Sequence, residues 1–573
     1  MESLVLKPSR PKQSLHYEAE LAGCSVLVVE GDNTCRSVMA TQLRELGFST
    51  VTQQSRIRQA RELLNTRRFD VILCSHYFDG NSPTGQDLLD DLRREAMLPL
   101  STVFIMVTSE ASYAKVEQAA ESGLDGYLLK PHSAANLMRL LLAARRRKQH
   151  MADIFWALEQ QQLAQAIRLC QQRFDSRSMF WLYSARLGAE LMLRTAQYEQ
   201  AGALYRSVVA ATGEPWARAG IARVMLSLGQ FGQATAALET LTREVPDFAD
   251  GYDVLGRAQL KLGLLEQAMA SYRVASDLTP SSIARLQRLG MLAYYVGDPA
   301  EAEQLLHQAT HLGQNSRSYD YQTLALLSLL RATQGNWPGV QRVRDVAKAM
   351  QRKAPDIMRL RRVGMLVDGA ALLQHQSSPE ALSIVRELGG ALQAPEFDFD
   401  LACNLLNLLS LLASDGSHVE EANETVMRLA NRFCTSDATC ALLTSAAKAH
   451  EGFTQVVRQC NEHLMSLSEQ AMKLHLDGDY RGAIDRFQAL ADTHLNARMF
   501  ETANRLFLRH ASEFADAAQR QAALESLRER AGVSRARPGY GDSQGRPPAG
   551  VVLRISTSLP DAMNSWYWTV HTP

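Results

Sequence analysis

Polar side chains stand directly after short apolar runs at several places near the beginning of the chain. Glu30 follows SVLVV, Ser75 follows VILC, Thr108 follows VFIMV, and Lys130 follows GYLL. A carboxylate can ligate a metal ion, and an ammonium group requires an anionic partner. In α/β sheets, such chemistry gathers at the carboxyl ends of the strands. The chemistry of these residues therefore depends on whether the runs are strands of one sheet.

The apolar runs have the composition of strands that are buried on both faces. Residues 25–29, 71–74 and 103–107 are almost entirely apolar, and amphipathic helical patterns lie between them, including 36–46 and 57–64. Buried runs of this length are typical of a parallel sheet, and their alternation with helices predicts a doubly wound α/β domain. We place this domain at residues 24–148, after an N-terminal extension of residues 1–23.

The whole of this segment resembles a response regulator receiver domain. The matching pieces are VVEGDNTCRSVMATQLRELGF, FDVILCSHYFDG, FIMVTSE and GYLLKP, which agree with the family in order, spacing and strand context. The resemblance implies a five-stranded, flavodoxin-like parallel sheet. It also implies a Mg²⁺ ion held by acidic residues, an Asp that accepts a phosphoryl group from a histidine kinase, and a hydroxyl and a lysine that contact that group.

Some family positions are retained in this sequence. Thr108 falls on the hydroxyl position, Lys130 on the lysine position, Tyr127 on a position that is often an aromatic switch, and Glu30 on the first acidic position.

Two family positions are degenerate. Gly31 replaces the second acidic residue, and Ser75 stands at the phosphoacceptor position. The acceptor must be a carboxylate, because it attacks phosphorus as an anion and ligates the metal, whereas a serine hydroxyl is neutral at pH 7. We expect no cofactor and no metal; Mg²⁺ would bind only if Asp32 or Asp79 took over the missing role. Lys130 should then pair with Glu30 or Asp32, which would fix the domain in one state as a docking module.

A helical repeat follows the first domain. Gly229, Gly263 and Gly297 are 34 residues apart, and three alanines repeat at the same step. This period is the mark of tetratricopeptide repeats, and the unit 249–282 resembles their pattern closely. We assign residues 149–530 to an all-α solenoid of such repeats, with a weak repeat signal from about 340 to 460. Residues 531–573 are rich in Gly, Pro, Ser and Arg, which predicts a flexible C-terminal tail.

The concave face of such a solenoid binds peptides. By the geometry of the family, Arg223 and Arg257 lie on one stripe, with Lys261 nearby and Tyr294 and Tyr295 one repeat further on. Two arginines and two tyrosines would suit an acidic peptide or a C-terminal carboxylate. The alternative is a solvated helix face with one buried tyrosine. Another basic group, Arg359, Arg361 and Arg362, is expected to be a solvated face.

Composition excludes several classes of function. Lys and Arg total 61 and Asp and Glu total 61, and a net charge of zero argues against a nucleic-acid-binding protein. No apolar stretch is long enough to span a membrane. Eight scattered cysteines favour free thiols in a reducing cytoplasm. No catalytic motif appears, so we expect no enzyme but a scaffold of a bacterial phosphorelay, with protein partners at both modules. A phosphorylatable response regulator with a repeat output is the alternative.

Overall fold

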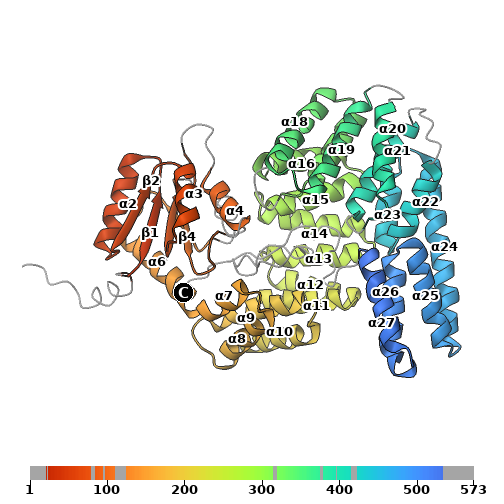
Figure 1. The fold of residues 1–573 in the computed structure, drawn as a ribbon, viewed down its shortest axis with the longest axis horizontal. Coiled ribbons are helices and arrows are strands. Elements are labelled where there is room, and N and C mark those ends of the chain that lie inside the picture. The colour runs from red at the N-terminus through yellow and green to blue at the C-terminus, as the bar shows by residue number, and fades with distance from the viewer. Residues whose placement is uncertain are drawn as a thin grey trace, which may run out of the picture.

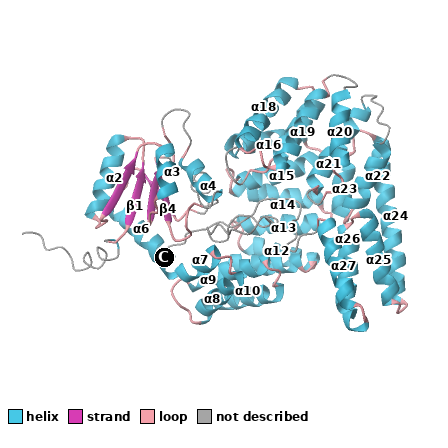
Figure 2. Cartoon of the chain, viewed as in Figure 1, coloured by secondary structure: helices cyan, strands magenta, loops and turns pink. Residues whose placement is uncertain are grey.

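The fold comes from a computed structural model. The structure describes residue 21 and residues 23–78, 84–94, 97–109, 124–313, 319–374, 379–394, 397–414 and 422–532. Asp79, nearly all of the N-terminal extension and the tail beyond residue 532 lie outside these ranges. Figure 1 shows a small sheet domain beside a large array of helices, and Figure 2 shows that the drawn strands belong to the sheet domain.

The N-terminal domain is the predicted five-stranded parallel sheet. Its strand order is β2-β1-β3-β4-β5, and neighbouring strands pair in parallel. The strands are β1 (Ser25–Val29), β2 (Thr50–Gln54), β3 (Val71–Ser75), β4 (Val103–Thr108) and β5 (Gly126–Leu129). The described helices of the domain are α2 (Asn33–Glu45), α3 (Ile57–Thr66), α4 (Gly85–Arg94) and α6 (Ala134–His150).

Helices cover both faces of this sheet. One apolar cluster joins alternate strand residues to α2 and α6, and a second joins the intervening strand residues to α3 and α4. This two-sided burial explains why the strands are continuously apolar rather than alternating in polarity. The predicted fold class of the domain is therefore confirmed.

The helical array begins one residue after α6. Its first ten helices are α7 (Ala152–Glu159), α8 (Leu163–Asp175), α9 (Trp181–Arg194), α10 (Tyr198–Thr212), α11 (Pro215–Ser227), α12 (Phe231–Glu244), α13 (Ala249–Lys261), α14 (Leu265–Leu278), α15 (Ile283–Val296) and α16 (Pro299–Gly313). The later ones are α17 (Gln322–Thr333), α18 (Trp337–Lys353), α19 (Met358–Leu372), α20 (Pro379–Gly390), α21 (Phe399–Ser414), α22 (Ala422–Phe433), α23 (Asp437–Ala446), α24 (Glu451–Leu476), α25 (Tyr480–His494), α26 (Ala497–His510), the short η1 (Ala511–Glu513) and α27 (Ala517–Arg530).

The predicted 34-residue period is visible in the helix starts. α11, α13 and α15 begin at residues 215, 249 and 283. Gly229, Gly263 and Gly297 end the first helix of each pair with φ of 78°, 78° and 101°, a left-handed conformation that favours glycine. The period therefore arises from one turn that is repeated between equivalent helices.

Later helices pack back onto earlier ones. α21 contacts α17, and α23 contacts α15. In Figure 1, α23 lies beside α15. The array is therefore not a simple one-dimensional stack, and this has consequences for the expected peptide site.

Candidate functional site

The strand ends bring Glu30, Ser75 and Lys130 together. Lys130 Nζ donates to Glu30 Oε2 at 2.5 Å and to Ser75 Oγ at 3.4 Å. The Glu30 side chain is 4% exposed and that of Lys130 is 21% exposed. A carboxylate and an ammonium group that are both withdrawn from water stabilise each other only when they are paired. The arrangement is an ion pair with a neutral hydroxyl at its side.

Asp32 serves a different purpose from Glu30. Its side chain accepts the Cys35 N–H at 2.6 Å and so caps the N-terminus of α2. Hydrogen bonding to Cys35 lowers the pKa of Asp32, which is exposed. The Asp32 N–H in turn donates to Glu30 Oε1 at 3.0 Å. Of the two carboxylates expected to pair with Lys130, Glu30 forms the ion pair.

The remaining receiver positions line the same edge of the sheet. Thr108 is buried, and its carbonyl accepts the Lys130 N–H at 2.7 Å. Tyr127 lies on β5 and packs against the cluster beneath α3 and α4. At Gly31, an added Cβ would lie 3.5 Å from Phe78 Cδ1, an ordinary contact distance. The space at position 31 would therefore accept the Cβ atom of a larger residue.

These residues do not fit a Mg²⁺ ion. Mg²⁺ requires several hard oxygen ligands in near-octahedral geometry. At the three family positions stand Glu30, which already pairs with Lys130, a glycine and the neutral Ser75. In the described part of the chain, no group of three or more His, Cys, Asp and Glu residues could hold a metal ion.

The five expected groove residues do not form one exposed stripe. Arg223 is buried, with Nη1 3.8 Å from Glu190 Oε2, whereas Arg257 is half-buried and Lys261 is exposed on α13.

Tyr294 and Tyr295 are buried beneath later helices. Asn407 Nδ2 of α21 donates to Tyr294 Oη at 2.7 Å, and Ser445 Oγ of α23 donates to the Tyr295 carbonyl at 2.5 Å. This placement differs from an open groove, because reasoning within one repeat does not reveal that helices more than 100 residues later cover α15.

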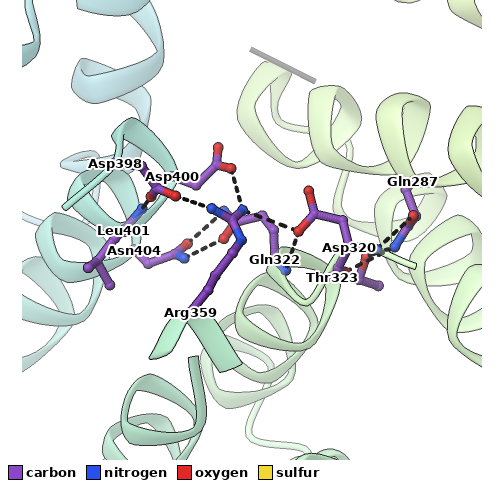
Figure 3. A network of polar contacts seen from close by, with 9 residues as sticks. All are labelled: Gln287, Asp320, Gln322, Thr323, Arg359, Asp398, Asp400, Leu401 and Asn404. Carbon is purple, nitrogen blue, oxygen red and sulfur yellow. Dashed lines mark hydrogen bonds and ion pairs between the residues drawn. The ribbon is translucent and has the colours of Figure 1, made fainter. Parts of the chain in front are cut away.

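A polar network surrounds Arg359 at the start of α19. Its guanidinium contacts Asp398, approaches Asp400 Oδ2 at 2.8 Å and lies 3.2 Å from Asp320 Oδ1 (Figure 3). Burial raises the pKa of Asp400 to about 7, although Arg359 opposes the shift. The expectation of a solvated face at Arg359 was therefore wrong.

The network borders a cavity of about 240 Å³. Its walls are Gln322, Met358, Arg359, Arg362, Val363, Asp398, Asp400, Leu401 and Asn404. Sequence reasoning missed this cavity because its walls come from three separate helices. The one local signal was Asp398, whose carboxylate accepts the Leu401 N–H at 2.8 Å as a helix cap.

Comparisons with known proteins agree with this architecture. The family model described as the response regulator receiver domain matches residues 26–142, and a tetratricopeptide repeat model matches residues 192–258. Chemotaxis protein CheY-3 of Vibrio cholerae is 32% identical over 118 residues, which are 20% of this chain and 87% of that protein. Chemotaxis protein CheY of Pseudomonas aeruginosa is 33% identical over 111 residues, 19% of this chain and 86% of that protein. The solved receiver domain of the Francisella response regulator 1452 is 27% identical, with a TM-score of 0.20, and covers 22% of this chain and 99% of its own.

Over the ranges that the structure describes, no helix has both the length and the apolarity needed to cross a bilayer.

Proposed function

Because this chain belongs to the response regulators, through a receiver domain followed by tetratricopeptide repeats, we propose that it is a non-catalytic scaffold of two-component signalling. The receiver domain would dock one signalling protein in a single fixed state. The solenoid would hold a second protein. No resident cofactor takes part in this function.

The Lys130–Glu30 ion pair is the observation that carries this proposal. Phosphoryl transfer to a receiver requires a carboxylate nucleophile and a cation that is available to the incoming group. Here the acceptor position holds the neutral Ser75, and Lys130 already has an anionic partner within the protein. Glu30 thus gives Lys130 the negative charge that a phosphoryl group would otherwise bring.

The solenoid supports the second half of the proposal. On the expected stripe, Arg257 is half-buried and Lys261 is exposed, and these two cations would meet an acidic peptide or a C-terminal carboxylate. Reversing both charges, as in Arg257→Glu with Lys261→Glu, should abolish capture of this second partner in a pull-down. Unchanged capture would place the peptide site elsewhere on the repeats.

A cytoplasmic location is part of the proposal. All eight cysteines are free thiols, a state that a reducing compartment maintains.

A phosphorylation assay tests the fixed state directly. The full chain is incubated with Mg²⁺ and acetyl phosphate, and its intact mass is measured before and after acid treatment. We expect no adduct on the natural sequence and an acid-labile adduct on the double variant Gly31→Asp/Ser75→Asp. An acid-labile adduct on the natural sequence would favour the alternative, a working response regulator in which another carboxylate accepts the phosphoryl group.

A further inference from the structure

The receiver domain and the solenoid are joined without a linker. α6 ends at His150 and α7 begins at Ala152, so one residue, Met151, separates them. Met151 is fully buried; its N–H donates to the Arg147 carbonyl, and its carbonyl accepts the Phe155 N–H. Figure 1 shows α6 running from beneath the sheet directly to α7. The main chain therefore crosses between the domains in nearly continuous helical hydrogen bonding.

Asp125 is the centre of the contact on the receiver side. It directly precedes β5, whereas Lys130 follows the other end of that strand. Its Oδ2 accepts the Phe104 N–H of β4 at 3.0 Å. Its Oδ1 lies 3.1 Å from both Arg147 Nη2 and Lys148 Nζ of α6. The Asp125 side chain is only 8% exposed. One buried carboxylate thus ties β4, β5 and the end of α6 together.

The same cluster reaches the solenoid through the segment before β4. Lys148 Nζ donates to the Leu100 carbonyl at 2.7 Å, and the Leu100 N–H donates to Glu159 Oε1 of α7 at 2.7 Å. The Leu100 side chain packs against the first apolar cluster of the solenoid. The Arg147 guanidinium lies 5.6 Å from the ring centre of Tyr183 on α9, within the range of a cation–π contact. Polar and apolar groups of the receiver domain therefore both contact the solenoid.

Independent motion of the two domains would break the contacts that cross between them. Separation would take the Arg147 guanidinium away from the ring of Tyr183 and the Lys148 ammonium group away from the ring of Phe155, while Asp125 keeps both cations on the receiver side. It would also expose Leu100 and remove the hydrogen bond that the Leu100 N–H donates to Glu159. A flexible tether between two modules would have none of these features, since domain boundaries normally lie in polar linkers crossed by few contacts.

We propose that Glu159 on the solenoid side, with Arg147 and Lys148, which Asp125 holds in place on the receiver side, locks the receiver domain to the solenoid in one orientation. The protein then presents its two binding modules at a fixed distance and angle. This inference deepens the proposed scaffold role and rests on it. The four residues are positioning residues, because they hold the modules and do not contact a bound partner.

Distance measurement between paired nitroxide labels tests the lock on the full chain. Labels are placed at Glu45→Cys on α2 and Gln200→Cys on α10, both exposed positions, with the half-buried Cys35 and Cys460 replaced by serine. We expect one narrow distance distribution for the reference chain. In Asp125→Asn/Glu159→Ala, the narrow peak should be lost to a broad distribution. Asn retains an acceptor for the Phe104 N–H, so the sheet itself keeps its hydrogen bond.

Two further measurements keep this test decisive. Glu62→Ala, which removes an exposed ion pair with Arg58 on α3, should leave the distribution narrow. Glu159→Ala alone acts from the solenoid side and should broaden the distribution even if Asp125→Asn unfolds the receiver domain. A broad distribution in the reference chain, or a narrow one in Asp125→Asn/Glu159→Ala, would overturn the lock. No phosphodonor is present, so this result is independent of the phosphorylation assay.

Discussion

An ammonium group at the end of a buried strand is stabilised by an anion within reach. Lys130 finds that anion in Glu30, whose side chain is almost completely buried. The pairing was predictable because both residues follow strands of one parallel sheet, and the missing acceptor carboxylate left few other partners. Asp32 was the competing candidate, and the cap that it forms on α2 explains why it is not the partner.

Breaking this pair from one side should destabilise the receiver domain. Glu30→Gln leaves a half-buried ammonium group without its carboxylate, which costs about 3 kcal/mol, the lower end for a buried pair that loses one member. The double variant Glu30→Gln/Lys130→Met should lose less than the sum of the single variants, because neither charge is then stranded. Urea unfolding followed by circular dichroism measures both effects. Glu62→Ala is the matched exposed control and should cost at most about 1 kcal/mol; an equal loss in Glu30→Gln and Glu62→Ala would contradict the role of the pair.

Asp400 should make stability depend on pH near neutrality. Its pKa in the folded chain is about 7, because burial disfavours the anion, against about 4 for an ordinary Asp. Between these values the folded state binds more protons than the unfolded state, so this group destabilises the fold increasingly as pH rises from about 4 to about 7. We expect Asp400→Asn to raise the melting temperature at pH 8 and to flatten its decline between pH 5 and pH 8.

The control for this pH effect is Asp368→Asn. Asp368 forms a half-exposed ion pair with Arg344 on the neighbouring helix, outside the cavity. Its replacement should leave the pH profile of the melting temperature unchanged. If the profiles of Asp400→Asn and the natural sequence coincide, the raised pKa of Asp400 is not a property of the folded chain.

At the scale of single elements, the 34-residue period was the most informative signal in the sequence. It placed the starts of α11, α13 and α15, because the turn glycine and the small residues of the helix contacts recur at fixed offsets. The region from about 340 to 460 lacked that regularity. The sequence therefore predicted helices there but did not show which helices pack against each other. The Arg359 network lies there, and its partners are 39 and 41 residues away in the sequence, where no local pattern connects them.

Gly256 tests how closely the two helices of one repeat approach. An added Cβ would lie 2.7 Å from Tyr272 Cε1, and the ring is buried and cannot move freely. Gly256→Ala should therefore destabilise the solenoid by about 1–3 kcal/mol through overpacking. Gly232→Ala on α12 is the matched control, since nothing lies within 4 Å of its added Cβ, and it should be neutral or slightly stabilising. Thermal unfolding of the two variants compares them; equal melting temperatures would show that the contact relaxes without cost.

At the scale of the whole molecule, the contacts of α21 with α17 and of α23 with α15, and the hydrogen bond from α21 to α15, set this solenoid apart from a stack in which each repeat touches only its neighbours. Tyr294 and Asn407 are joined by a 2.7 Å hydrogen bond across 113 residues of sequence. In the sequence, the two residues are only an aromatic residue and an amide in separate helices, and nothing connects them. For this reason an open peptide site was expected at Tyr294.

The return contact should make distant repeats unfold together. Tyr294→Phe leaves the buried Asn407 amide without its acceptor, which costs about 1–3 kcal/mol, whereas Asn407→Leu/Tyr294→Phe should cost less than the two single variants combined. Native-state hydrogen exchange locates the effect: Tyr294→Phe should accelerate exchange in α21 and α23 as well as in α15. Tyr252→Phe, whose hydroxyl contacts Thr242 in the neighbouring helix, should accelerate exchange only around α12 and α13. If the effect of Tyr294→Phe is equally local, the solenoid behaves as a linear stack, and the cover over α15 contributes little to holding the repeats together.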